Sequence, residues 1–295
     1  MSEPLFVFTT PRLLASLSCA MIGNHPDMVG LAETNLFTAE TYVELETVYL
    51  IDQRFQHGLL RTIAEFGLGG QTETNIELAQ SWLFDNESVK TIDIFKDIMA
   101  LVEPRHVVDT SILYVYRPGV INRITNAFPD AYYLHLSLNP RYTCEMIHKT
   151  RKLAADTHLG RQAGRDIALN PDDMWLKPHI HILNGLENIS ATHKMFLRGE
   201  DLLSDPHPNL LKIAEWLGVR TDQESIDAMM RPDESPFANY GPENASLGND
   251  PHFLENPGLI SISNQAMDLE APMSWDETLV LDDDLKELAS YLGYG

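Results

Sequence analysis

The chain has 295 residues, 44% of them apolar, which is enough to bury the core of one large domain or two small ones. Its 43 acidic and 21 basic residues give a formal net charge of −22, so nucleic acids and anionic membranes, which require patches of Lys and Arg, are not expected partners. No apolar stretch reaches membrane-spanning length and the N-terminus lacks a signal-peptide pattern. We therefore expect a single domain, residues 1–295, in a cytoplasmic protein.

The first stretch with a functional pattern covers residues 5–24. Residues 5–8 form an apolar run of strand length, residues 9–12 a polar turn, and a helix follows from Leu13. A helix start after a strand offers backbone N–H groups and a positive dipole end to an anion, and Arg12 and Ser16 would assist. The alternative for Arg12 is a structural ion pair with a loop carboxylate. The turn carries Leu13 and Leu14 where phosphate-binding loops carry glycine, which predicts a weak phosphate grip.

A second short strand is expected at residues 28–31, and Glu33 follows it. Carboxylates after strands of α/β sheets often face the ligand crevice, although Glu33 could equally be a carboxylate at a helix start or on the surface. His25 precedes this strand within His-Pro-Asp, a sequence that is also typical of a turn.

The rest of the chain alternates helices and strands, which predicts an α/β sheet flanked by helices. Residues 39–103 look mainly helical, and the glycine cluster 67–70 reads as a helix end. Residues 151–173 look like an exposed loop or lid, and the absence of Lys and Arg between Pro232 and Leu285 accompanies an irregular wrap at about 232–275. The other expected elements are strands at 106–111, 132–138 and 195–197 and helices at 121–127, from 140, at 209–218 and at 276–291.

No metal site is predicted. Cys19 and Cys144 do not have a metal-binding spacing and are expected to be buried apolar residues in a reducing compartment. His179 and His181 are two residues apart, and His193 lies further on. Side chains two residues apart on a helix point in different directions, so these histidines do not have the spacing of metal ligands.

Several motifs together resemble the bacterial sulfotransferase family. They are Thr-Pro-Arg at 10–12, Glu-Thr-Asn-Leu-Phe at 33–37, Phe-Pro-Asp-Ala at 128–131 before a strand, Asn-Pro-Arg at 139–141, Arg-Gly-Glu-Asp-Leu-Leu-Ser-Asp-Pro at 198–206, and the return segment from Ser-Pro-Phe at 235–237 to Gly-Asn-Asp at 248–250. The resemblance covers nearly the whole chain. It implies a parallel, P-loop-like sheet, a sulfuryl transfer reaction and the donor 3′-phosphoadenosine 5′-phosphosulfate (PAPS).

The resemblance also assigns residues. Glu33 is the first candidate for the base that accepts the proton of the acceptor hydroxyl, and His25 is the second. Arg12, Ser16, Arg141 and Gly248 are the candidates for donor binding.

The chain departs from the family's pattern at the donor site. Leu13 and Leu14 replace the serine and glycine of the 5′-phosphosulfate loop, Leu138 and Met146 stand at the 3′-phosphate arginine and serine positions, and Thr110 stands at a lysine position. Lost arginine contacts with phosphate cost on the order of 2–5 kcal/mol each in a buried site. A cation from the neighbouring helix could restore the charge, the candidates being Arg141, Lys149 and Arg151.

The functional hypothesis is therefore a sulfotransferase-like enzyme that acts on a hydroxyl-bearing small molecule, an intermediate of specialised, natural-product metabolism. Two alternatives stay open at this point: an enzyme of the same fold that does not use PAPS, and a catalytically silent binding protein. The sequence does not give the oligomeric state.

Overall fold

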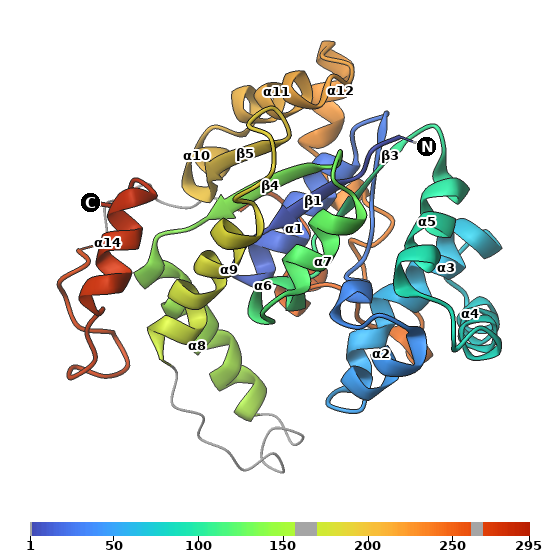
Figure 1. The fold of residues 1–295 in the computed structure, drawn as a ribbon, viewed down its shortest axis with the longest axis horizontal. Helices are drawn as coiled ribbons and strands as arrows, with labels where there is room; N and C mark the ends of the chain where they lie inside the picture. The colour runs from blue at the N-terminus through green and yellow to red at the C-terminus, as the bar shows by residue number, and fades with distance from the viewer. Residues whose placement is uncertain (1, 157–169, 261–267) are drawn as a thin grey trace.

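The computed structural model describes residues 2–156, 170–260 and 268–295. In these residues five parallel strands form one sheet in the order β2-β3-β1-β4-β5 (Figure 1). The strands are β1 (Leu5–Phe8), β2 (Met28–Gly30), β3 (His106–Asp109), β4 (Tyr132–Ser137) and β5 (Lys194–Arg198). The predicted α/β class with a parallel central sheet flanked by helices is confirmed.

The two faces of the sheet are covered by separate sets of helices because side chains alternate along β1. Phe6 and Phe8 pack into one apolar cluster, and Leu5 and Val7 into another. The first cluster includes residues of α2 (Tyr42–Tyr49), α3 (His57–Leu68), α4 (Glu73–Asp85), α5 (Thr91–Val102), α6 (Leu113–Tyr116), α7 (Val120–Ala127) and α9 (Lys177–Gly185). The second includes residues of α1 (Arg12–Gly23), α10 (Gly199–Ser204), α11 (Pro206–Leu217), α12 (Gln223–Met229) and α13 (Pro251–Glu255).

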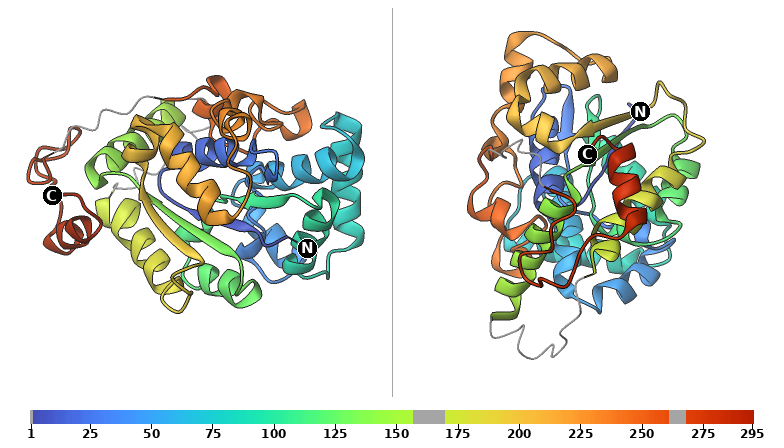
Figure 2. Two further views of the ribbon diagram at one scale, coloured as in Figure 1. Left: turned by 90° about the horizontal axis from the view of Figure 1, so that it is seen from above. Right: turned by 90° about the vertical axis from the view of Figure 1, so that its left-hand side faces the viewer.

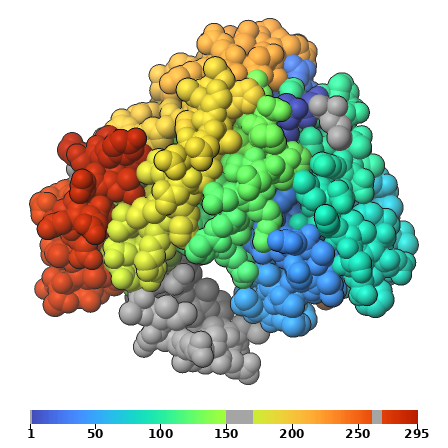
Figure 3. All heavy atoms as spheres, viewed as in Figure 1, coloured from blue at the N-terminus to red at the C-terminus, as the bar shows by residue number. Residues whose placement is uncertain are grey.

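A third apolar cluster lies beside the sheet, where the C-terminal part of the chain packs. It joins α8 (Pro140–Asp156), the π-helix η4 (Asp172–Leu176) and α14 (Asp283–Tyr291). Figure 2 shows α14 at one end of the molecule, far from α3 and α4. In Figure 3, α9 and α7 lie side by side across the face that it presents. The remaining short 3-10 turns are η1 (Leu36–Thr38), η2 (Gln53–Gln56), η5 (Pro232–Glu234) and η6 (Glu243–Ala245).

Most expected elements are present with ends shifted by a few residues, and two expectations were wrong. The last helix begins at Asp283 instead of 276, because the Asp276 carboxylate accepts the N–H and hydroxyl of Thr278 in a turn. Residues 151–156 continue α8 and are not part of a loop. The rest of the expected lid, residues 157–169, lies outside the described residues, whereas 172–176 form η4.

Two further expectations, for the glycine cluster and for the cysteines, are confirmed. Gly69 ends α3 with a positive φ of 79°, so the glycine cluster is a helix end. Cys19 and Cys144 are buried and free. Within the described ranges, no helix is both long enough and apolar enough to cross a bilayer.

The start of α3 approaches the backbone that follows β2 so closely that only glycine fits. A Cβ on Gly58 would overlap the carbonyl oxygen of Glu33 and lie 2.6 Å from its carbonyl carbon. The Cα of Gly58 also lies 2.9 Å from the Cβ position of Gly248, whose φ is +117°. Three segments far apart in sequence therefore meet at Glu33, and this contact fixes the position of that residue.

We predict that Gly58→Ala lowers the free energy of unfolding by about 1–3 kcal/mol, because rigid backbone would have to move to admit the methyl group. Urea unfolding followed by circular dichroism measures the change. Gly67→Ala is the matched control in the same helix, since its Cβ would meet only the side chains of Leu101 and Ile63, at 3.5 and 3.9 Å. It should be neutral or stabilising by up to about 1 kcal/mol. Equal effects of the two substitutions would contradict the close approach at Gly58.

Candidate active site

Polar residues gather where the parallel strands end. Arg12 begins α1 after β1, Glu33 follows β2 and Asp109 ends β3, while Asn139 and Gly199 follow β4 and β5. The carboxyl ends of parallel strands share one edge of the sheet, which is where α/β folds bind ligands. This edge is the candidate site.

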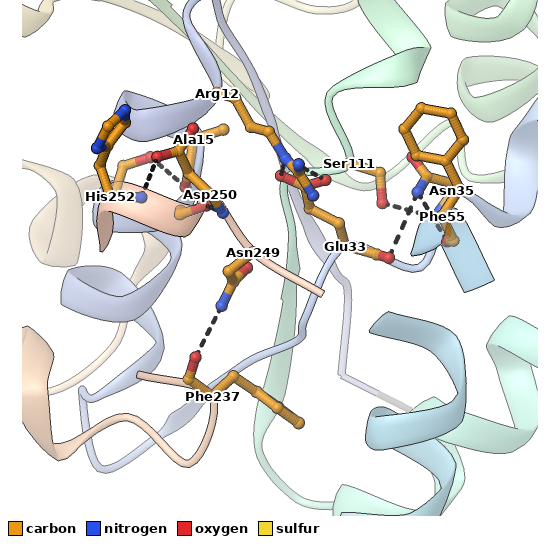
Figure 4. A network of polar contacts seen from close by, with 12 residues as sticks. Arg12, Ala15, Glu33, Asn35, Phe55, Ser111, Phe237, Asn249, Asp250 and His252 are labelled. Atoms are coloured by element: carbon orange, nitrogen blue, oxygen red, sulfur yellow. Dashed lines mark hydrogen bonds and ion pairs between the residues drawn. The ribbon is translucent and has the colours of Figure 1, made fainter. Parts of the chain in front are cut away.

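Arg12 and Glu33 form an ion pair at the centre of this edge. The Nε atom of Arg12 donates to both carboxylate oxygens of Glu33, at 2.7 and 2.9 Å (Figure 4). The Glu33 side chain is 1% exposed and that of Arg12 is 27% exposed. Burial raises the pKa of Glu33 and the guanidinium lowers it, with a net rise. The structural pair with a loop carboxylate, one of the two expectations for Arg12, is therefore present.

The pairing leaves part of Arg12 available. Among the described residues, its two terminal guanidinium nitrogens make no hydrogen bond, because only Nε engages Glu33. Burial lowers the pKa of Arg12, but the charge of Glu33 outweighs this and the net pKa is raised. Arg12 thus stays charged and can still contact a ligand.

Ser16 and Gly248, two of the predicted donor-binding residues, hold the return segment in place. The Ser16 hydroxyl accepts the backbone N–H of Asp250 at 2.9 Å. The Gly248 carbonyl accepts the N–H of Glu33 at 2.7 Å. The structure thus brings both of them to the Arg12–Glu33 pair, and their hydrogen bonds attach residues 248–250 to α1 and to the loop after β2.

Arg141, the fourth predicted donor-binding residue, points to a different partner. Its Nη1 donates to the backbone oxygen of Asp268 at 3.0 Å, and its Nε lies 3.6 Å from a carboxylate oxygen of Glu145. These contacts tie the guanidinium to the C-terminal segment and to its own helix. Lys149 is exposed on α8, and the side chain of Arg151 lies outside the described residues.

The apolar residues at the donor positions pack against each other. A Cβ on Gly199 would lie 2.9 Å from a methyl carbon of Leu14 and 2.8 Å from one of Leu138. Both leucines are 1% exposed and belong to the same core cluster. The two leucines that the resemblance assigns to donor positions, Leu14 and Leu138, therefore meet at the start of α10.

His25 lies at the opposite edge of the sheet, because it precedes β2. It is 1% exposed, its Nδ1 accepts the N–H of Asp27 at 3.0 Å, and its Nε2 lies 2.8 Å from the carbonyl oxygen of Arg220. The structure therefore does not bring His25 together with Glu33, and both of its ring nitrogens contact backbone.

Asp109 is the centre of a buried hydrogen-bond network next to Glu33. Its carboxylate accepts the Ser111 hydroxyl at 2.8 Å, the Ser111 N–H at 3.1 Å, the Tyr114 hydroxyl at 2.9 Å and the Thr34 hydroxyl at 3.5 Å. Burial nevertheless raises the pKa of Asp109 to about 6. The sequence placed Asp109 and Ser111 in the expected strand at 106–111 without indicating this network. Tyr114 gave no signal, because it joins the network from α6.

A second buried group, missed in the sequence, contacts the turn before Arg12. His135 Nε2 lies 2.7 Å from His179 Nδ1, and His179 Nε2 lies 3.4 Å from the Thr10 hydroxyl. Burial lowers the pKa of His135 to about 3 and that of His179 well below its usual value. Both rings are therefore neutral at physiological pH and add no positive charge beside Thr10. The sequence did not indicate this pair, because His135 lies within the alternating pattern of β4 like any other strand residue.

The chain was compared with protein families and with solved structures. The model of the sulfotransferase family matches residues 4–223, so the chain belongs to that family. Similar solved structures are the sulfotransferase domain from the curacin biosynthetic pathway (TM-score 0.76, 20% identity, 100% of this chain and 99% of that chain) and the sulfotransferase domain from the Synechococcus PCC 7002 olefin synthase (TM-score 0.74, 20% identity, 100% and 97%). None of the curated proteins compared with the chain matches it. At these identities the structural likeness shows the fold.

The pKa of Asp109 predicts a pH dependence of stability. A carboxyl group whose folded pKa is about 6, against an ordinary 3.8, stabilises the fold fully below pH 3.8 and loses this contribution as the pH rises through 6. The loss is on the order of 3 kcal/mol. We expect the unfolding free energy of the wild type, minus that of Asp109→Asn, to fall by this amount between about pH 4 and 7 in urea titrations. A difference that is flat or rises with pH would contradict it.

Proposed function

We propose that the protein is a sulfotransferase-like enzyme that acts on the hydroxyl group of a small molecule, an intermediate of specialised metabolism. The observation that carries the proposal is the buried Arg12–Glu33 pair at the carboxyl edge of a sheet of this family. The structural relatives named for curacin and olefin synthesis support the metabolic context. A net charge of −22 supports small molecules over nucleic acids as partners.

The role proposed for Glu33 is to accept the proton of the substrate's hydroxyl group as the hydroxyl oxygen bonds to the sulfuryl group. A general base must be oriented and must have a pKa closer to neutrality than that of a free carboxylate. The bifurcated hydrogen bond from Nε of Arg12 to both oxygens orients the Glu33 carboxylate, and burial raises the pKa of Glu33. Arg12 would stabilise the carboxylate form of Glu33 before the proton is transferred to it. The terminal nitrogens of Arg12 are available to bind an anionic group.

The family's donor, PAPS, fits these residues poorly. Leu14 and Leu138 meet over Gly199, the Ser16 hydroxyl accepts a backbone N–H, and Arg141 is tied to Asp268. Of the residues assigned to the donor, Arg12 alone combines a charge with uncommitted donor groups in the described part of the chain. The packed leucines also favour a second candidate function, an enzyme of the same fold that does not use this donor.

Substitution of the two predicted bases tests the proposal. With radiolabelled PAPS at millimolar concentration and a panel of hydroxyl-bearing acceptors, Glu33→Gln should lower the transfer rate by about 100-fold or more, because the amide cannot accept the proton. His25→Gln should lower thermal stability and leave the rate per folded molecule within about twofold, since His25 contacts backbone at the far edge. Unchanged transfer in Glu33→Gln would remove Glu33 as the base, and a large rate loss confined to His25→Gln would reassign the role to His25.

Calorimetric titration tests the fit of the donor. We expect PAPS to bind with a dissociation constant on the order of 1 mM or weaker, because the arginine contacts of the family are missing. Leu138→Arg should tighten binding by about tenfold, and Leu138→Met, a matched control without charge, should not. Micromolar binding by the wild type would contradict this prediction and show that a cation such as Lys149 supplies the missing charge.

A further inference from the structure

Asn249 has a buried amide oxygen whose partner is missing from the described residues. Its side chain is 3% exposed and its Nδ2 donates to the backbone oxygen of Phe237 at 3.0 Å. Reversing the amide would set two oxygens against each other, so this bond fixes the orientation of the group. The Oδ1 atom is then an acceptor, and no described residue donates to it. A buried acceptor without a donor is costly, and a bound donor group would remove that cost.

Asn249 lies at the Arg12–Glu33 pair. Its neighbour Gly248 accepts the N–H of Glu33, and its other neighbour, Asp250, donates to Ser16 on α1. Figure 4 shows the side chain between Phe237 and the ion pair, with its nitrogen turned toward Phe237 and thus its oxygen turned away from it. The orphan acceptor therefore belongs to the candidate site.

A second orphan acceptor lies on the other side of Glu33. Asn35 is 1% exposed, and its Nδ2 donates to the backbone oxygen of Phe55 at 3.2 Å and to that of Glu33 at 3.5 Å. These bonds fix its amide in the same way, and its Oδ1 also finds no donor in the described residues. Two independent side chains that flank Glu33 thus have buried acceptor oxygens to which no described residue donates.

The charged groups that act most strongly on Arg12 are carboxylates. The carboxylates of Glu33, Asp250 and Asp52 all act on Arg12, and that of Asp250 also acts on Glu33. Arg54, the next cation, is itself bound to Asp52 at distances down to 2.5 Å. The return segment that carries Asn249 has no Lys or Arg between Pro232 and Leu285. The site is therefore rich in acceptors and negative charge.

We propose that this site binds the ammonium group of its substrate, so that the substrate class is an amino alcohol. An ammonium group offers three donors and a positive charge, which match the oxygens of Asn249 and Asn35 and the surrounding carboxylates. A sulfonate or phosphate group offers only acceptors, so it would face these two oxygens unfavourably and would be expected at the terminal nitrogens of Arg12 instead. The inference rests on the proposed function, because it assigns the acceptor of that reaction, but the binding that it predicts can be measured without any transfer.

The test compares two probes that differ in one group, 6-amino-1-hexanol and 1,6-hexanediol, by calorimetry at pH 7. We expect the amine to bind to one saturable site at least tenfold more tightly than the diol. Asn249→Leu should weaken amine binding about tenfold, because it removes the acceptor. Asn249→Asp loses the hydrogen bond to Phe237 but adds a negative charge, so it should tighten amine binding by a similar factor. If the role of Asn249 were purely structural, both substitutions would change the affinity for the amine in the same direction.

A control variant distinguishes amine binding at the site from attraction of the amine to the acidic surface. Glu77→Gln removes an exposed charge on α4 and should leave amine binding unchanged, and thermal unfolding establishes that each variant is folded. Equal affinity for the two probes, no binding of either, or amine binding that is indifferent to both Asn249 variants would overturn the proposal. Amine binding as expected together with no sulfuryl transfer would leave the inference standing and refute the proposed function alone.

Discussion

The structure of the site depends on keeping one carboxylate, Glu33, inside the protein. Burying an unpaired carboxylate costs several kcal/mol, so its position has to be supported from several sides. Arg12 supplies the opposite charge, and the carbonyl of Gly248 accepts the backbone N–H. The missing side chain of Gly58 lets α3 pack directly on the carbonyl of Glu33. The loop after β2, the first turn of α1, the start of α3 and the return segment are therefore fixed relative to each other by the same residue.

Many buried polar side chains lie at this edge of the sheet, but few of them carry a positive charge. Asp109 has a pKa of about 6, and the His135–His179 pair is neutral at physiological pH because burial disfavours the charged form. Neither group adds a positive charge to the site. Arg12 carries the positive charge at the centre of the site and shares it with Glu33.

The two halves of the carboxyl edge of the sheet differ in polarity. On the side of β4 and β5, Leu14 and Leu138 pack over Gly199 as part of the core. On the side of β2 and β3, hydrogen bonds and an ion pair hold Glu33, Thr34 and Asp109 in defined positions. The polar residues of the site are thus held rigidly on the side of β2 and β3, while apolar side chains pack together on the side of β4 and β5.

The sequence by itself determined the α/β class, the positions of the strands and the polar residues that follow them. These features depend on local patterns: apolar runs of strand length, helix-start residues and glycine stops. It also placed Arg12, Ser16 and Glu33 at the carboxyl edge, because each follows a strand, and it identified the leucines at donor positions. It missed the late start of the last helix, where the turn at Asp276 outweighs an acidic helical pattern.

Only the tertiary structure decided which of these residues meet. Sequence patterns give the face and edge of an element but not the loop that returns to it from 200 residues away, as the segment at Gly248 returns to Glu33. The structure separated His25 from the site, tied Arg141 to Asp268 and left the Asn249 oxygen without a partner in the described chain. Such contacts depend on the packing of several distant segments at once, and the spacing of residues along one chain does not encode them locally.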